Sequence, residues 1–202
     1  DGVLSFIPTA SSGTFRIHTG TNTTQTLGAV VINKAGTTME LRTAFKCSTL
    51  TITAGTLDTR SADNNALTVT GDIEIADGGA KLAYNDSTVT CARLGVGLGG
   101  VGIIDGGTSE AGKIIVNGTG NVRILDLADA VLTGSVPTFE YQGQATSATQ
   151  ALSGLSSGTF NLIVNSDGAS EKCIPNGSVT SLNDLTMTDG EFELPSSTNI
   201  DA

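Results

Sequence analysis

Residues Leu27–Leu82 read LGAVVINKAGTTMELRTAFKCSTLTITAGTLDTRSADNNALTVTGDIEIADGGAKL, and this stretch decides the fold class. At its centre, the tetrapeptide LTIT places Leu50 and Ile52 in alternation with threonines. Successive side chains of a strand point to opposite faces, so this pattern predicts a strand with one buried and one solvent-exposed face. Gly55 permits a sharp corner, and Leu57 starts the next inward face. We therefore expect short strands that are joined by tight corners.

The same alternation continues through Leu67–Ile75, which reads LTVTGDIEI. Gly71 and Asp72 predict a bend or bulge inside this stretch. The residues expected to face inward are Leu67, Val69, Ile73 and Ile75. Further strands are predicted at Leu82–Tyr84, Val89–Leu94, Lys113–Asn117, Asn121–Leu125, Phe160–Asn165 and Leu185–Thr188. The best helix candidate, Gln144–Leu155, is interrupted by Ser, Thr and Gly and predicts at most a short turn.

Strand-and-turn pieces begin at Leu50, Leu67, Leu82 and Leu94, so they recur every 12 to 17 residues. A β-solenoid uses rungs of about 20 residues, each of which buries its apolar face against its neighbours. We therefore predict an all-β chain with the fold of a β-solenoid. An antiparallel β-sandwich or jelly roll is the alternative, because it also consists of many short strands with turn signals between them.

Two sequence patterns each occur twice and indicate an internal repeat. The pentapeptide SSGTF occurs at Ser11–Phe15 and at Ser156–Phe160, and LTITAGTLD at Leu50–Asp58 is answered by LTMTDGEFE at Leu185–Glu193. We interpret them as one structural unit that is begun twice, with an abbreviated second copy. The predicted domains are residues 1–135, a β-solenoid body, and residues 136–202, a second, shorter β unit or cap that carries the second copy.

The phrases VVINKAGTTMEL, STLTITAGTLDT and ALTVTGDIEIADGGAKL within Leu27–Leu82 resemble β-helical repeat segments of other proteins. Similar segments occur in bacteriophage fibre, spike and head-exterior proteins and in large bacterial surface adhesins. The resemblance implies a right-handed parallel β-helix, often trimeric in phage proteins, that serves as a stalk, spike or decoration. The shared motif is structural, so no functional residue is carried over.

The charge balance of the chain argues against several kinds of partner. Its 202 residues include 20 acidic and 10 basic side chains, for a net charge of −10. A nucleic acid or an anionic membrane would repel such a chain, because the basic residues are scattered and form no patch. We find no signal peptide or transmembrane run and expect no membrane insertion. The chain begins at Asp1 rather than Met, so we expect a mature product or a fragment.

Three cysteines, Cys47, Cys91 and Cys173, lie far apart in the sequence. An odd number at wide spacing is not a disulfide framework, and no Cys/His cluster accompanies them. We expect small buried apolar side chains, while one disulfide plus one free thiol stays open.

No set of catalytic residues is predicted. The single histidine, His18, is expected on the exposed face of an N-terminal strand, and no G-x-S-x-G nucleophile motif occurs. Two carboxylate pairs, Asp72/Glu74 and Asp126/Asp129, are the candidates for glycosidase chemistry. The chain has no Trp for stacking against sugars, so we expect no enzyme activity.

Calcium is the ligand that the acidic turns would suit best, since calcium takes six to eight oxygen ligands. Each turn supplies too few oxygens, and none fits an EF-hand loop, so we predict no metal and no cofactor. The acidic turns are Asp63-Asn64-Asn65, Asp77-Gly78-Gly79, Asp105-Gly106-Gly107 and the segment from Asp184 to Asp189-Gly190-Glu191. The glycine-rich stretch Gly95–Gly107 lacks the strand-loop-helix context of a phosphate loop and predicts a flat pair of small-residue strands.

The function expected from this pattern is structural and non-enzymatic. The first hypothesis is an exterior protein of a bacteriophage virion, namely a fibre, spike or head decoration that gives stability or attachment to a host surface. The alternatives are a bacterial surface adhesin module and a polysaccharide-degrading enzyme. Expected partners are copies of the same chain, as a homotrimer, other virion proteins and host-surface glycans. The expected location is the virion exterior, or alternatively the cell surface.

Overall fold

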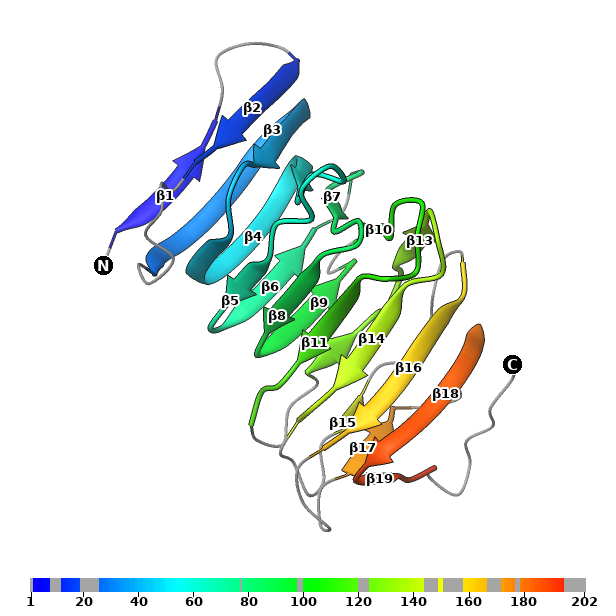
Figure 1. Ribbon diagram of the computed structural model, residues 1–202. Coiled ribbons are helices and arrows are strands. Elements are labelled where there is room, and N and C mark those ends of the chain that lie inside the picture. Colours follow the sequence, from blue (N-terminus) through cyan, green and yellow to red (C-terminus); the bar gives the residue numbers. More distant parts are fainter. Residues whose placement is uncertain are drawn as a thin grey trace.

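The computed structural model describes residues 2–7, 12–18, 26–76, 78–97, 100–119, 124–143, 149–150, 158–166, 172–176 and 179–194. These residues form an all-β, parallel β-solenoid of about 7 turns, with no helix among them. Figure 1 shows the strands stacked side by side along one axis, from β1 at one end to β18 at the other. Because the strands pair in parallel throughout the described ladders, the β-solenoid prediction is confirmed and the antiparallel sandwich is excluded.

The central turns contribute strands to three faces, and each face is a ladder of parallel strands. Face 1 contains β1 (Val3–Phe6), residues 29–32 of β3 (Leu27–Leu41), residues 49–52 of β4 (Phe45–Asp58), β6 (Asp72–Ile75), β9 (Arg93–Val96) and β12 (Leu125–Asp126). Face 2 contains β2 (Gly13–Ile17), residues 37–41 of β3, residues 56–58 of β4, β7 (Lys81–Ala83), β10 (Ile103–Asp105) and β13 (Val131–Thr133).

Face 3 is the ladder that reaches the C-terminal end. It contains residues 45–47 of β4, β5 (Leu67–Val69), β8 (Thr88–Cys91), β11 (Lys113–Val116), β14 (Thr138–Tyr141), β16 (Phe160–Asn165) and β18 (Leu182–Asp189). A further sheet contains β15 (Thr149–Gln150), β17 (Lys172–Pro175) and β19 (Glu191–Phe192). The ladder of face 3 crosses residue 136, so strands from both predicted domains belong to one sheet.

The core is a set of apolar stacks that run along the axis. Alternation within each strand points every second side chain inward, and parallel in-register pairing places these side chains above one another. The stacked residues are Leu50, Ile73, Leu94 and Leu125 on face 1, Leu57, Leu82 and Ile104 on face 2, and Leu67, Val89, Ile114, Phe139 and Leu162 on face 3, and all are buried. Each such side chain contributes about 1.5–3 kcal/mol of burial free energy.

The predicted inward residues of the deciding stretch are confirmed. Leu50, Ile52 and Leu57 are buried, as are the four residues expected in the next stretch, Leu67, Val69, Ile73 and Ile75. The bend expected at Gly71 is the corner at Thr70 and Gly71, which separates β5 on face 3 from β6 on face 1.

The longer repeated pattern, at Leu50–Asp58 and Leu185–Glu193, has a similar local conformation in both copies but a different place in the fold. Residues 50–58 run from face 1 to face 2, whereas residues 185–193 run from β18 on face 3 to β19. Both copies turn at a glycine with positive φ, Gly55 at 87° and Gly190 at 85°. The shared pattern therefore specifies a strand, a glycine corner and a second strand rather than a position in the solenoid. The second SSGTF lies partly outside the described residues.

The glycine-rich stretch 95–107 is not a pair of adjacent strands, because β9 pairs with β6 and β12 while β10 pairs with β7 and β13. Its two ends lie on different faces of one turn. The helix candidate at 144–155 lies outside the described residues, except for the two residues of β15.

The three cysteines are buried free thiols, as expected from their spacing. Cys47 and Cys91 lie on β4 and β8, with β5 between them. Two strand spacings amount to about 9.5 Å, which is beyond the Cα separation of a disulfide. Burial raises the pKa of Cys47 to about 12 and raises those of Cys91, where nearby Asp72 adds to the effect, and Cys173. These thiols are protonated and shielded in the folded chain.

Candidate functional site

The carboxylate pair Asp72/Glu74 lies on the outer surface of face 1. Strand β6 points Ile73 and Ile75 into the core, so Asp72 and Glu74 point outward together. Register places Arg93 of the next turn beside Asp72. The Nη1 atom of Arg93 lies 3.4 Å from Asp72 Oδ2 and 3.3 Å from Glu74 Oε1. One guanidinium nitrogen therefore contacts both carboxylates.

A half-open pocket of about 380 Å³ lies next to this ion cluster. Its lining residues are Asp72, Ala92, Arg93, Gly118, Thr119 and Ile124. Gly118 lies so close to the carbonyl oxygen of Ala92 that a Cβ atom at this position would collide with it. The lining thus combines one carboxylate, one guanidinium, one hydroxyl and a small apolar surface.

The two carboxylates of this cluster have similar surroundings. The side chains of Asp72 and Glu74 are 46% and 43% exposed, so water competes for both carboxylates. A glycosidase pair requires one carboxyl group that stays protonated and a second that is ionised. Arg93 contacts both carboxylates alike, so the geometry gives the two groups no separate surroundings for these roles.

The second predicted pair, Asp126/Asp129, is part of a turn. Asp126 is buried, and its Oδ1 accepts a hydrogen bond of 3.2 Å from the backbone N–H of Ala128. Asp129 is exposed and has a φ of 61°, a left-handed conformation that Asp tolerates in turns. These contacts assign Asp126 and Asp129 to turn formation.

A buried carboxylate that the sequence did not single out is Glu140, on the outer surface of face 3. Lys113 Nζ lies 2.6 Å from its Oε2, and the side-chain amides of Asn165 and Gln142 donate to its Oε1 over 2.7 and 2.5 Å. Ile115 and Ile163 flank Glu140 on the neighbouring strands. Burial by itself would raise the pKa of Glu140, but the hydrogen bonds from Asn165, Lys113 and Gln142 outweigh it and hold the pKa below its usual value.

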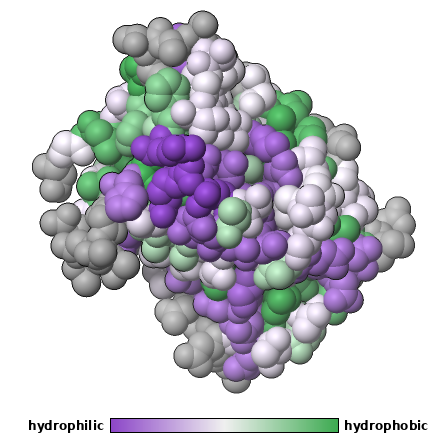
Figure 2. Space-filling model, turned by 45° about the horizontal axis from the view of Figure 1, so that its top comes forward, coloured by the Kyte–Doolittle hydropathy of each residue, from purple (hydrophilic) through white to green (hydrophobic). Residues whose placement is uncertain are grey.

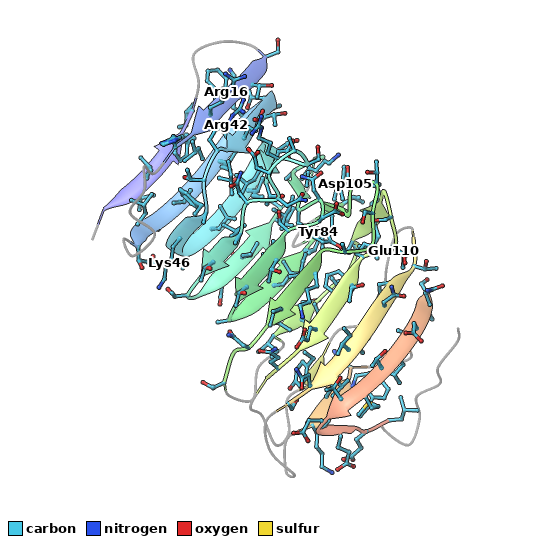
Figure 3. The ribbon with its side chains drawn as sticks, in the orientation of Figure 1. Arg16, Arg42, Lys46, Tyr84, Asp105 and Glu110 are labelled. Carbon is cyan, nitrogen blue, oxygen red and sulfur yellow. The ribbon has the colours of Figure 1, made fainter. Side chains whose placement is uncertain are left out.

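A second cluster that the sequence did not single out lies at the outer edge of face 2. Glu40 contacts two arginines, with Arg42 Nε at 2.8 Å and Arg60 Nε at 3.0 Å from its Oε1. Arg60 also pairs with Asp63. In Figure 3, Arg42 lies close to Arg16 at the N-terminal end of the ribbon. Acidic and basic groups alternate in this cluster, so it forms no patch of one sign.

In two of the acidic turns, the aspartate is held by contacts that the structure shows. Asp63 pairs with Arg60, and Asp105 pairs with Lys81 while its Oδ1 accepts the N–H of Gly107 over 2.9 Å. Asp77 lies outside the described residues. Within the described ranges, no group of three or more His, Cys, Asp or Glu side chains is arranged to hold a metal ion.

His18 is exposed and follows β2 directly, which agrees with its predicted place on the surface. In the part of the chain that the structure covers, no helix is long and apolar enough to span a membrane.

Comparison of the chain with protein-family models, curated proteins and solved structures found no match to any of them.

Proposed function

We propose that this chain is a structural, non-enzymatic protein of the exterior of a bacteriophage particle, as a fibre segment, spike or head decoration. The observation that carries the proposal is the uninterrupted ladder of face 3, which extends from residues 45–47 to β18. The apolar side chains beneath it form one continuous core. Stacked coils of this kind support a stiff, protease-resistant body, and stiffness is what a fibre or decoration contributes.

The polar surface is compatible with weak, repeated contacts to host-surface glycans. On face 3, the amide of Asn183 donates to Asn161 Oδ1 over 2.8 Å, and the amide of Asn161 lies 3.4 Å from Thr138 Oγ1. Figure 2 shows one face of the molecule on which hydrophilic residues form a contiguous cluster and hydrophobic residues form separate patches. A single contact with hydroxyl groups is weak, so attachment would depend on many copies that act together.

The partners proposed for the chain are further copies of itself and other virion proteins. The net charge of −10 disfavours a role on nucleic acid or on an anionic membrane surface. The proposed location is the virion exterior, with the bacterial cell surface as the alternative.

Immuno-electron microscopy tests the location. Antibodies raised against the purified chain would be applied to phage particles and to cells from the same culture, with antibodies depleted on the chain as the control. We expect label on the outside of the particles. Label confined to cell envelopes would replace this proposal with the adhesin alternative.

A second candidate, action on a polysaccharide, is favoured by one observation, the pocket beside Asp72 and Arg93. Incubation of the chain with capsular or exopolysaccharide from the host would test it. We expect no release of reducing ends, and sustained release would rescue the enzyme hypothesis.

A further inference from the structure

Among the described residues, the large exposed apolar side chains are concentrated at the two ends of the solenoid. Among the described residues, the exposed large hydrophobic side chains are Val3 (66%), Leu4 (41%), Ile7 (61%), Val101 (42%), Met187 (46%) and Leu194 (39%). Five of these six lie in the first or the last turn, and only Val101 lies along the side. Single exposed hydrophobic residues are ordinary, but their concentration at both ends of one axis indicates two contact surfaces.

Two of these exposed residues, Leu4 and Met187, continue the core stacks outward. Leu4 pairs in register with Val30, which is buried, so Leu4 is the next inward position of face 1. Met187 pairs with Val164, which is also buried, so Met187 is the next inward position of face 3. Each end therefore has the pattern of a rung whose outer neighbour is missing from the stack.

Among the described residues, each end of the solenoid has an edge strand with one pairing partner. In the described part of the chain, β1 pairs only with β3, and β18 pairs only with β16. A free edge presents a row of N–H and C=O groups that can pair with another strand. Because the strands of the ladders are all parallel, a copy that is shifted along the axis and rotated about it, so that its β1 lies over β18, offers an edge of matching direction.

Among the described residues, the two ends carry charges of opposite sign. The described residues of the first turn, 2–7 and 12–18, include Arg16 and no acidic side chain. Figure 3 places Arg16 at that end of the ribbon. The described residues of the last turn, 172–176 and 179–194, include one basic side chain, Lys172, and the acidic residues Asp184, Asp189, Glu191 and Glu193. An end-to-end contact of unlike ends brings opposite charges together, whereas a contact of two C-terminal ends opposes like charges.

We propose that the C-terminal end surface, formed by β18 and β19, docks onto the N-terminal end surface, formed by β1 and β2, of a second copy of this chain. The contact is head to tail, so each added copy presents a new free end and the product is a linear polymer. This inference goes beyond the proposed function, because it names the occupant of each end and requires no virion.

Two variants, each blocked at one end, test the direction of assembly. Leu4→Asp places a carboxylate in the N-terminal contact, and Met187→Asp places one in the C-terminal contact. Both side chains are exposed in the single copy, so both variants should keep the fold, as circular dichroism would verify. Val101→Asp is the matched control, because Val101 is exposed to a similar degree on the side of the solenoid.

Sedimentation velocity and electron microscopy of the purified chain would give the readout. We expect the wild type and Val101→Asp to form linear series whose length grows with concentration. Each end variant alone should stay monomeric, because an uncompensated buried carboxylate weakens the contact by more than about 100-fold. An equimolar mixture of the two end variants should form dimers and nothing longer, since each dimer has one intact contact and two blocked ends.

Four results would overturn the proposal. They are a wild type that stays monomeric at its highest soluble concentration, an end variant that still dimerises on its own, a mixture that stays monomeric, and a Val101→Asp variant that loses assembly. Dimers of Leu4→Asp alone would identify a symmetric contact of C-terminal ends instead. None of these results depends on whether the chain belongs to a phage particle.

Discussion

Two carboxylate clusters on the outer surface of the same solenoid have opposite environments. Glu140 on face 3 is 4% exposed and receives hydrogen bonds from one ammonium group and two amides. Asp72 and Glu74 on face 1 are nearly half exposed and share the guanidinium of Arg93 at 3.3–3.4 Å. The first cluster is closed by neighbouring strands, whereas the second borders an open pocket.

The difference is a consequence of what each neighbouring rung supplies. Around Glu140, the adjacent strands supply Ile115 and Ile163, which exclude water, together with donors that satisfy the carboxylate. Beside Glu74, the adjacent rung supplies Gly95, which has no side chain to cover it. We infer that the Glu140 cluster stabilises the fold, whereas the Arg93 cluster borders the pocket and is partly exposed to solvent.

The largest expected effect is the loss of the buried acid. Glu140→Ala leaves the donors of Lys113, Asn165 and Gln142 without their shared acceptor, and we expect the free energy of unfolding to fall by about 2–4 kcal/mol. Glu74→Ala removes an exposed partner and should change it by less than about 0.5 kcal/mol. Urea denaturation of both variants measures the contrast, and equal losses would contradict the distinction between the two clusters.

The second effect is a dependence of stability on pH. The pKa of Glu140 is lower in the folded chain than its usual value, so the folded state binds this proton less tightly than the unfolded state does. The stabilisation is therefore present above the usual pKa of Glu and is lost as the pH falls through the lowered folded value. Denaturation of the wild type and of Glu140→Gln across the acidic range measures it. We expect the difference between the two curves to shrink towards low pH, and a constant difference would contradict this source of stability.

A smaller effect comes from the two cations. Lys113→Met leaves Glu140 buried with only amide donors, and we expect a loss of about 1–2 kcal/mol. Arg93→Met leaves two carboxylates that water can reach, and we expect a loss of less than about 1 kcal/mol. The side chain of Lys113 is more exposed than that of Arg93, at 38% against 23%. A larger loss of stability for Lys113→Met would therefore show that the burial of the carboxylate, rather than the burial of the cation, determines the loss. Chemical denaturation gives the comparison, and a larger loss for Arg93→Met would reverse that conclusion.

The direction of each side chain could be predicted from the sequence, whereas its neighbours on other rungs could not. Alternation within one strand identifies its inward residues, and residues such as Leu50, Ile52 and Ile73 are buried as expected. The outward direction of Asp72 and Glu74 follows from the same local rule. These predictions need no knowledge of which strands are neighbours.

Contacts between rungs require the register, which local patterns do not contain. Phe45 pairs with Leu67, 22 residues later, whereas Leu94 pairs with Leu125, 31 residues later. The corners and loops vary in length, so the offset varies from turn to turn, and an error of one residue moves a side chain to the opposite face. For this reason the contacts of Lys113 with Glu140 and of Arg93 with Asp72 could not be derived from spacing.

A small effect on stability is expected for the variant that tests the function of the exposed cluster. The double variant Asp72→Asn/Glu74→Gln keeps the shape of the exposed cluster and should change the free energy of unfolding by less than about 1 kcal/mol. If face 1 only holds glycans, neither the wild type nor the double variant should release reducing ends from host polysaccharide. The matched control is Asp184→Asn, an exposed change on face 3 far from the pocket. Release by the wild type and by Asp184→Asn, but not by the double variant, would make Asp72 and Glu74 catalytic, and the open cluster rather than the stiff ladder would then define the function.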